Sequence, residues 1–287
     1  MPELPEVETV VRGLRPNLLN KKIVSFWTDN PKLIKNKSVD QFVSEIKNKK
    51  IINVRRRAKN IIVDFEGGYS LLVHLKMTGH FIFAKWKIEK GKMLPVSDGS
   101  VREKVNGYIR AIFTLDDKRM LGFSDLRKFG KMISGPTEMI EAEIGKFGTE
   151  APTIDFKELK TVLNASGRKI KQVLLDQTKI AGLGNIYADE VLWKSKIHPE
   201  TVSRSLSDKE IKMLLKSIHE ILALAIELGG SSISDYRNVE GAAGRYALDT
   251  LVYKREGQLC RRCKTPIKKM KIAGRTARYC PKCQIRR

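Results

Sequence analysis

The chain is 287 residues long, which suggests about two domains with substantial hydrophobic cores. It carries 55 lysine and arginine residues against 32 aspartate and glutamate residues, a formal net charge of +23. This excess points to a polyanionic partner, either a nucleic acid or an anionic membrane. The longest apolar run in a helical region, residues 221–226, is far shorter than the ~20 residues of a membrane span, and the acidic start is unlike a signal peptide. We therefore expect a soluble, cytoplasmic protein.

The first residues of the chain contain a candidate nucleophile. A small residue in second place allows aminopeptidases to remove Met1, which would leave Pro2 with a free secondary amine. Such an amine has a pKa of roughly 8, so it can attack an electrophilic carbon and form an iminium. Glu3 and Glu6 follow, and carboxylates there can donate or accept the protons of such a reaction.

The same stretch also has the features of a helix N-terminus. Pro5 suits a first helical turn, and acidic residues favour the positive end of the helix dipole. Apolar residues then recur with helical spacing, at Val7, Val10, Val11, Leu14 and Leu18. A helix start and a catalytic terminus are compatible interpretations.

After this helix, the pattern up to about residue 134 is mostly that of short β-strands. A Glu-Gly-Gly sequence at residues 66–68 separates two of them and predicts a hairpin. Residues 88–106 are polar with scattered glycines and predict a surface loop. Strands of this length and spacing indicate an antiparallel sandwich or barrel. The expected strands are residues 23–27, 61–65, 69–75, 81–83, 108–115 and 120–124.

Two stretches in this region could face a nucleic acid or could simply be structural. Residues 55–59 are basic and end in Lys59, so they could hold phosphates, although a basic run is usually a solvated face. The stretch that begins at His74 contains Met77. Taken alone, Met77 fits core packing and His74 fits a structural histidine.

A third stretch, residues 124–130, combines a guanidinium with an aromatic ring. An enzyme that extrudes a base from a duplex has to fill the hole and satisfy the orphaned partner base. Phe129 could stack into the duplex as a wedge, and Arg127 could hydrogen-bond the unpaired base. The alternative is an ordinary loop at a strand end, and Gly130 permits a tight backbone in either case.

Beyond residues 134–136, Ser-Gly-Pro, the pattern becomes helical, so we place a hinge near residue 135. Gly182 and Gly184 precede Asn185, where a helix start could form an anion site or a plain loop-to-helix turn. The expected helices are residues 155–165, residues 170–177, one that begins at Asn185, and a long amphipathic helix that a capping box opens at residues 207–210.

All four cysteines lie near the C-terminus, in two Cys-x₂-Cys pairs separated by sixteen residues. This spacing is typical of a zinc site, and four thiolates form a closed structural site with no open position for catalysis. Residues 253–287 carry 13 lysine and arginine residues and one acid, so the module offers positive charge to phosphates. Residues 274–279 lie where a hairpin tip would be. The predicted ligands of the single zinc ion are Cys260, Cys263, Cys280 and Cys283.

In order and spacing, these motifs resemble those of bacterial formamidopyrimidine-DNA glycosylases, base-excision repair enzymes for oxidised purines. The resemblance covers the whole chain and rests on the strings PELPEVE, RRAK, HLKMTG, DLRKFG and GLGNIYADEVLW, followed by the cysteine pairs. It implies an α+β multidomain fold. The expected domains are an antiparallel β-sandwich with an N-terminal helix (1–134), a helix–two-turn–helix domain (135–230), and a lesion loop with a zinc-binding β-hairpin (231–287).

The resemblance also implies a reaction. Pro2 attacks the sugar C1′ of a flipped-out purine nucleotide such as 8-oxoguanine or a formamidopyrimidine, and Glu3 acts as acid and base. Glu6 orients groups or shuttles protons. The Schiff base then undergoes β- and δ-elimination, which cuts the abasic strand. The catalytic set so implied is Pro2, Glu3, Glu6, Lys59 and Arg275.

Six residues are implied to contact damaged double-stranded DNA. Three fill the space of the extruded base, namely Met77, Arg127 and Phe129. The other three hold the DNA backbone, namely Lys59, Asn185 and Arg275. By the same resemblance the protein is expected to act as a monomer in the bacterial cytoplasm, at the nucleoid.

Three positions depart from the family pattern. Lys76 replaces a common glycine and Thr78 a common serine in the HLKMTG turn. Arg245 stands where the family often has an aromatic residue, in a loop that closes over the flipped base.

Two other functions fit parts of the sequence. The sister glycosylase for oxidised pyrimidines shares the Pro2-Glu3 start, but residues 4–8 match the purine enzyme better. A zinc-ribbon protein that binds DNA or RNA without catalysis would explain the charge and the cysteines. It would not explain the N-terminus or residues 125–130.

Overall fold

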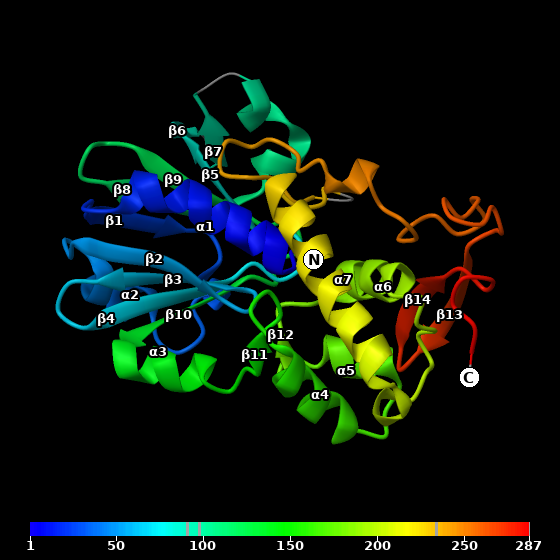
Figure 1. Ribbon diagram of the computed structural model, residues 1–287. Coiled ribbons are helices and arrows are strands. Elements are labelled where there is room, and N and C mark those ends of the chain that lie inside the picture. Colours follow the sequence, from blue (N-terminus) through cyan, green and yellow to red (C-terminus); the bar gives the residue numbers. More distant parts are fainter. Residues whose placement is uncertain (90–91, 97–98, 233–234, 287) are drawn as a thin grey trace. The chain divides into compact units, whose positions relative to one another are not determined.

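The computed structural model describes residues 1–89, 92–96, 99–232 and 235–286. The chain forms two compact units (Figure 1). The first unit comprises Met1–Gly145 and Leu228–Arg245, and the second comprises Lys146–Glu227 and Tyr246–Arg287.

The first unit contains helix α1 (Leu4–Leu18) and two four-stranded antiparallel sheets. This confirms the predicted antiparallel sandwich with an N-terminal helix. One sheet has the order β1 (Ile23–Thr28), β8 (Ile109–Leu115), β9 (Met120–Ser124) and β5 (His80–Ala84). The other has the order β10 (Lys131–Pro136), β4 (Tyr69–His74), β3 (Asn60–Phe65) and β2 (Ile51–Arg57).

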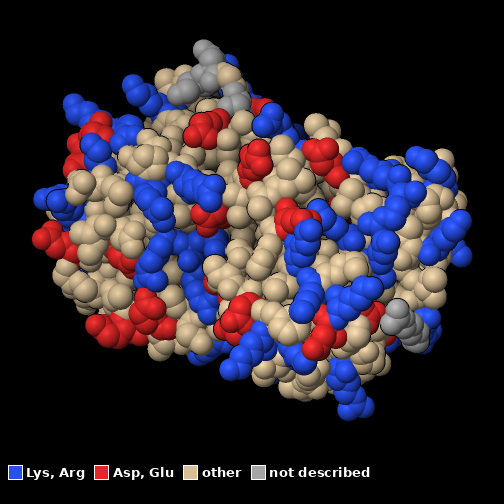
Figure 2. Space-filling view, in the orientation of Figure 1, with Lys and Arg blue, Asp and Glu red and all other residues tan. Residues whose placement is uncertain are grey.

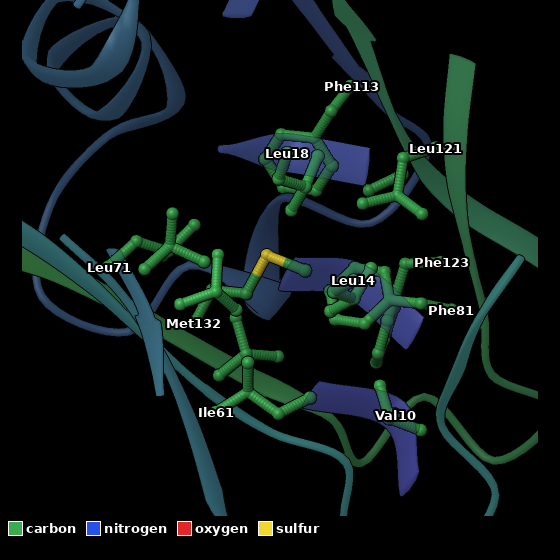
Figure 3. Packing of buried hydrophobic residues seen from close by; sticks show 14 of the residues in the cluster. Val10, Leu14, Leu18, Ile61, Leu71, Phe81, Phe113, Leu121, Phe123 and Met132 are labelled. Atoms are coloured by element: carbon green, nitrogen blue, oxygen red, sulfur yellow. The ribbon is translucent and has the colours of Figure 1, made fainter. Parts of the chain in front are cut away.

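The apolar face of α1 completes the core of this sandwich (Figure 3). The predicted face is confirmed, because its five apolar residues are all buried. Val10, Leu14 and Leu18 pack in one cluster with residues of both sheets. Burial of such side chains contributes about 1.5–3 kcal/mol each, so α1 is held firmly. Other members of the cluster are Phe81, Phe113, Leu121 and Phe123 from one sheet and Ile61, Leu71 and Met132 from the other.

Several elements of the first unit were not predicted, among them the strands β2 and β10, helix α3 (Thr137–Ile144), helix α2 and a hairpin. Helix α2 (Val39–Ile46) buries Phe42 and Ile46. Ser38 caps its N-terminus, because the Ser38 hydroxyl accepts a hydrogen bond from the Gln41 N–H at 3.2 Å. The surface loop expected at residues 88–106 is wrong in part. Strands β6 (Trp86–Glu89) and β7 (Lys92–Pro95) form a hairpin there, and residues 90–91 and 97–98 lie outside the described part. Polar composition concealed the hairpin, whose Trp86 is nevertheless buried in an apolar cluster.

The remaining elements complete the two units. Helix α3 (Thr137–Ile144) belongs to the first unit, together with the 3₁₀ turns Pro31–Leu33, Gly99–Arg102 and Lys104–Gly107. The second unit contains α4 (Phe156–Asn164), α5 (Ile170–Leu175), α6 (Asn185–Lys194), α7 (Asp208–Glu227), the short strands β11 (Thr149–Glu150) and β12 (Ile180–Ala181), the hairpin β13 (Lys268–Ile272) and β14 (Arg275–Tyr279), and 3₁₀ turns at Ser203–Ser205 and Tyr246–Leu248. Among the described residues, no helix is both long and apolar enough to cross a membrane.

Candidate functional site

Two connections cross from one sheet to the other at the same end of the sandwich. His74 of β4 pairs with Lys131 of β10, and His80 of β5 pairs with Ser124 of β9. The segments that join these strands, residues 75–79 and 125–130, therefore lie side by side. We call them the crossing loops. They carry Met77, Arg127 and Phe129.

A buried carboxylate holds the crossing loops together. The Thr78 hydroxyl donates a hydrogen bond to Asp125 and accepts one from the Arg127 N–H at 3.0 Å. The other oxygen of Asp125 accepts from the Gly130 N–H at 2.8 Å. Asp125 is 1% exposed, so these bonds are sheltered from water. The threonine that replaces the family's serine therefore supplies the hydroxyl that joins the two loops.

The side chains at the tips of the crossing loops are exposed. Met77 is 37% exposed and Phe129 is 50% exposed. The Arg127 guanidinium lies over the Phe129 ring, 4.6 Å from its centroid. The loops thus present one apolar, one aromatic and one planar cationic side chain on a fixed backbone.

Lys76 has a backbone conformation that explains why glycine is common at this position. Its φ angle is +58°, in the left-handed region that residues with a Cβ adopt at a cost. Its N–H donates to Nδ1 of His74 at 2.9 Å, which fixes the turn. Burial and the cations Lys131 and Lys35 lower the pKa of Lys76.

The start of α1 lies at the same end of the sandwich as the crossing loops. The helix runs along β2, with Arg15 donating to the Val54 carbonyl at 2.9 Å and Glu8 paired with Arg56 at 2.8 Å. Toward its N-terminus the helix therefore approaches the turn between β2 and β3, which contains Lys59. Asn60, the first residue of β3, pairs with His74.

This end of the sandwich is strongly cationic. Burial and the charges of Lys76, Lys131 and Lys59 lower the pKa of His74 to about 3. The ring is therefore neutral at physiological pH, and the lysines supply the positive charge.

Glu6 organises the N-terminal residues. It is 1% exposed, and its two carboxylate oxygens accept from the N–H groups of Glu3 and Ser231, each at 2.7 Å. Met1 precedes Pro2, so the Pro2 nitrogen is in a peptide bond until Met1 is removed. Met1 is 42% exposed and so is accessible to a peptidase.

Residues 235–245 form a tight loop on the first unit. Val239 is buried against Gly13 of α1, and its carbonyl accepts from the Phe83 N–H of β5 at 2.9 Å. The Asn238 side chain accepts from the N–H groups of Glu240 at 3.2 Å and Ala242 at 2.8 Å. This segment corresponds to the loop containing Arg245 that the sequence associated with the flipped base.

In the second unit, Asn185 is the first residue of α6. The turn before it is held by Gln177, which accepts from the Gly182 N–H at 3.0 Å and donates to the Leu183 carbonyl at 2.8 Å. Gly182 has a φ angle of +104°, so the turn requires glycine there. Among the described atoms, the buried Oδ1 of Asn185 has no hydrogen-bond partner. The helix start and this side chain can hold an anion.

The four cysteines converge as predicted. Their sulfur atoms all lie within 4.8 Å of one another, with Cys260–Cys283 at 3.9 Å and Cys263–Cys280 at 3.3 Å. Four sulfurs bound tetrahedrally at about 2.3 Å from one zinc ion would be about 3.8 Å apart. The cluster therefore fits one structural zinc ion.

Comparison with known proteins gives the family. Three family models match in order: the formamidopyrimidine-DNA glycosylase N-terminal domain over residues 1–132, its H2TH domain over residues 147–237, and the zinc finger found in FPG and IleRS over residues 257–285. The chain belongs to the formamidopyrimidine-DNA glycosylase family.

Its relatives span the full chain. The chain is 42% identical to the formamidopyrimidine-DNA glycosylase of Pediococcus pentosaceus, with all of both chains covered. It is 40% identical to that of Carboxydothermus hydrogenoformans, over 99% of this chain and all of the relative. A solved structure of the Lactococcus lactis Fpg with abasic-site DNA has a TM-score of 0.86 at 36% identity and covers 99% of this chain and all of the other. The same values hold for its complex with Fapy-dG DNA.

Membership of the glycosylase family confirms the family resemblance, the fold class and the zinc site. The zinc finger model and the cysteine geometry agree on one structural ion. Sequence reasoning missed residues that hold the zinc hairpin in place.

Lys171 and Asp189 form a fully buried ion pair, 2.6 Å apart, that supports the zinc hairpin. Lys171 also donates to the Thr276 carbonyl at 2.7 Å, and Asp189 accepts from the Arg278 N–H at 3.1 Å. The pair thus satisfies the free edge of β14, the strand that begins with Arg275. The sequence did carry a signal for this pair. Each of two expected helices has a charged residue among apolar neighbours, a lysine on one and an aspartate on the other.

Glu190, the next residue along α6, holds the chain that enters the zinc module. Its carboxylate accepts from three successive N–H groups, those of Leu251, Val252 and Tyr253, at 2.7–2.9 Å. Burial raises the pKa of Glu190. Helix α6 therefore carries Asn185 at its start and, through its two acids, fixes the hairpin that carries Arg275.

Arg275 is exposed and lines a basic cavity of about 320 Å³ in the second unit. Arg168 and Lys171 line the same cavity, with Asp176 as its acidic member. In Figure 2, lysine and arginine side chains predominate around β13 and β14 on the visible face. The hairpin therefore presents cations on a rigid support.

Proposed function

We propose that this chain excises oxidised purines from duplex DNA and then cleaves the abasic strand. One observation carries the proposal: the N-terminus, Lys59 and the exposed side chains of the crossing loops occupy one end of the sandwich, in a chain of the formamidopyrimidine-DNA glycosylase family. Related structures contain Fapy-dG DNA and abasic-site DNA, which are the substrate and intermediate of such a reaction.

The chemistry begins with the loss of Met1. The Pro2 nitrogen then attacks C1′, and the bond from C1′ to the damaged base breaks as the base departs with the proton of that nitrogen. The C1′–O4′ bond opens next: O4′ takes a proton from Glu3, and C1′ becomes the iminium carbon. Glu3 transfers protons during this step, since it is 2% exposed and adjacent to the nucleophile. Loss of a proton from C2′ of the iminium expels the 3′ phosphate, and a second elimination expels the 5′ phosphate. Glu6 holds the Glu3 N–H and so positions both residues.

The DNA contacts divide into two groups. Met77, Arg127 and Phe129 replace the extruded base, because apolar and planar groups can stack and the guanidinium can satisfy the orphaned base. The phosphates are held by Lys59, Asn185 and Arg275, and Lys59 and Arg275 also place the reacting sugar. Phosphate contacts carry no sequence information, so the second group holds any duplex, whereas the first group acts only where a base is extruded.

The partner is damaged double-stranded DNA, bound by one copy of the chain in the bacterial cytoplasm at the nucleoid. Within that division of work, residues 1–134 supply catalysis and Lys59, residues 135–230 supply Asn185, and residues 231–287 supply the lesion loop and the zinc finger with Arg275.

The test is a single-turnover assay with duplexes that carry a formamidopyrimidine, 8-oxoguanine or an oxidised pyrimidine. We expect release of the purine lesions and a one-nucleotide gap with phosphate at both ends. Binding without base release would contradict the proposal and favour a non-catalytic DNA-binding protein. Faster release of the pyrimidine would assign the chain to the sister activity.

A further inference from the structure

His80 is a buried polar residue that the proposed reaction does not use. It is 0% exposed and is the first residue of β5, directly after the crossing loop that carries Met77. Its Nε2 lies 2.8 Å from Oδ1 of Asn106, and its Nδ1 lies 3.3 Å from the Thr78 carbonyl oxygen. Burial lowers the pKa of His80, so the ring carries a single proton at physiological pH.

Asn106 continues this contact to the loop of residues 235–245. Its Nδ2 donates to the Gly241 carbonyl at 3.4 Å, and the residue is 1% exposed. An amide oxygen can only accept and an amide nitrogen can only donate. The direction is therefore fixed: the His80 Nε2–H donates to Asn106, and Asn106 donates to Gly241.

Asn106 is itself held in a fixed position. It lies in the 3₁₀ turn Lys104–Gly107, and the carbonyl of its neighbour Val105 accepts from the Ser124 hydroxyl at 3.0 Å. Ser124 pairs with His80 across β5 and β9 and directly precedes the second crossing loop. His80, Ser124 and Asn106 thus form one connected group that links both crossing loops to Gly241.

We propose that His80 and Asn106 are positioning residues that couple the entry of the crossing loops into the duplex to the closure of residues 238–245 over the extruded base. The inference rests on the proposed function, which gives these two segments their roles. His80 follows Gly79 in the chain, so a shift of the Met77 turn moves His80. These buried donors and acceptors cannot replace their partners with water. A shift of His80 is therefore transmitted through Asn106 to Gly241.

The variant Asn106→Asp separates the two bonds. It retains an acceptor for His80 but replaces the donor to Gly241 with an oxygen. We expect excision of a formamidopyrimidine from an intact duplex to slow about tenfold under single turnover, the scale of one lost buried hydrogen bond. Cleavage of DNA with a preformed abasic site should stay within about twofold, because no base has to be enclosed.

Two further measurements keep the test independent of folding. Glu103→Gln weakens the half-exposed ion pair with Arg237, a second side-chain link between these parts of the first unit, and should behave as the wild type. His80→Leu should reproduce the excision defect, and His80→Gln, whose amide can donate to Asn106, should restore it in part. Amide hydrogen exchange at Gly241 and Ala242 should accelerate in Asn106→Asp.

The outcomes distinguish the two claims. If the wild-type chain excises the lesion and Asn106→Asp excises it equally fast, the coupling is overturned and the proposed function stands. Equal slowing on intact and abasic DNA also overturns it, since His80 and Asn106 would then be scaffold residues. A wild-type chain that binds the duplex but releases no base overturns the proposed function and the coupling with it.

Discussion

The crossing loops of the first unit and the zinc hairpin of the second unit differ in the side chains that they expose and in what holds those side chains in place. The crossing loops expose Met77 and Phe129, and the buried carboxylate of Asp125 holds the two loops together. The hairpin exposes Arg275, and its support is a metal site together with a buried ion pair. A side chain that enters a base stack has to fit a shape, whereas one that grips a phosphate needs charge on a rigid backbone. The two regions should therefore respond differently to mutation, salt and pH.

The largest effect is expected from loss of the zinc ion. Cys280→Ser removes one of four ligands, and metal binding in such modules contributes about 10–16 kcal/mol to folding. We expect the variant to lose zinc and DNA binding together, while the first unit remains folded. Zinc content, DNA binding and hydrogen exchange of β13 and β14 are the measurements. Full-rate cutting of damaged DNA by metal-free protein would show that the hairpin needs no zinc.

The buried ion pair should give the next largest effect, and the effect should depend on pH. Lys171→Met leaves Asp189 without its cation, and breaking a buried pair costs about 3–5 kcal/mol. Burial raises the pKa of Asp189 to about 7. When folding raises the pKa of a carboxyl group, the group stabilises the fold fully at pH values below its pKa in the unfolded state, about 3.9. This stabilisation is lost as the pH rises through the pKa in the folded state.

Lys171 lowers the pKa of Asp189, so its removal raises that pKa further. The cost of Lys171→Met should therefore be small near pH 5, where Asp189 is protonated in both proteins, and should grow as the pH rises above about 7. Denaturation of both proteins across this range is the measurement. A cost that is independent of pH would mean that Asp189 is ionised throughout. Lys160→Met, which breaks the exposed pair with Asp208, is the matched control and should cost less than about 1 kcal/mol at every pH.

Salt dependence should distinguish the two regions directly. Arg275→Ala removes the proposed phosphate contact, so the slope of log K against log salt should shrink by about one unit. Phe129→Ala removes no charge and should leave the slope unchanged. It should instead slow excision from an intact duplex more than cleavage of abasic DNA, because the wedge offsets an unstacking cost of a few kcal/mol. A changed salt slope and equal slowing on both DNAs would make Phe129 a scaffold residue.

The smallest effect is expected at Lys76. Lys76→Gly relieves the positive φ angle and the repulsion from Lys131 and Lys35, so stability should rise by up to about 1 kcal/mol. Lys118→Gly, at φ +67° in the exposed turn between β8 and β9, controls for the backbone effect alone. A thermal melt of both variants checks this. A loss of stability in Lys76→Gly alone would show that the lysine side chain supports the turn.

Local sequence patterns predicted much of the fold because the relevant signals are short-range. Apolar spacing predicted α1, the Glu-Gly-Gly turn predicted the β3–β4 hairpin, and the Ser207–Glu210 capping box predicted the start of α7. Contacts between distant residues could not be predicted in this way. Asp125 joins the crossing loops and Asp189 holds β14 only because the fold brings together residues 47 and 89 positions apart.

The candidate site shows the same division. Motifs of the family located Pro2, Lys59 and Phe129, yet no motif indicated that Glu6 would bond Ser231, which lies 225 positions away. Lys76 was noted as a departure, but only the φ angle gives the physical reason why glycine is common there.

Covalent trapping at Pro2 tests the central claim most directly. Protein with Met1 removed is incubated with abasic-site duplex and borohydride, which reduces the iminium to a stable tertiary amine that links the chain to the DNA. The account predicts one protein–DNA adduct, mapped by mass spectrometry to the N-terminal peptide at Pro2, and no adduct from protein that retains Met1. An adduct on a lysine, or equal trapping by Pro2→Gly or by the Met1 form, would contradict a specific role for the proline amine.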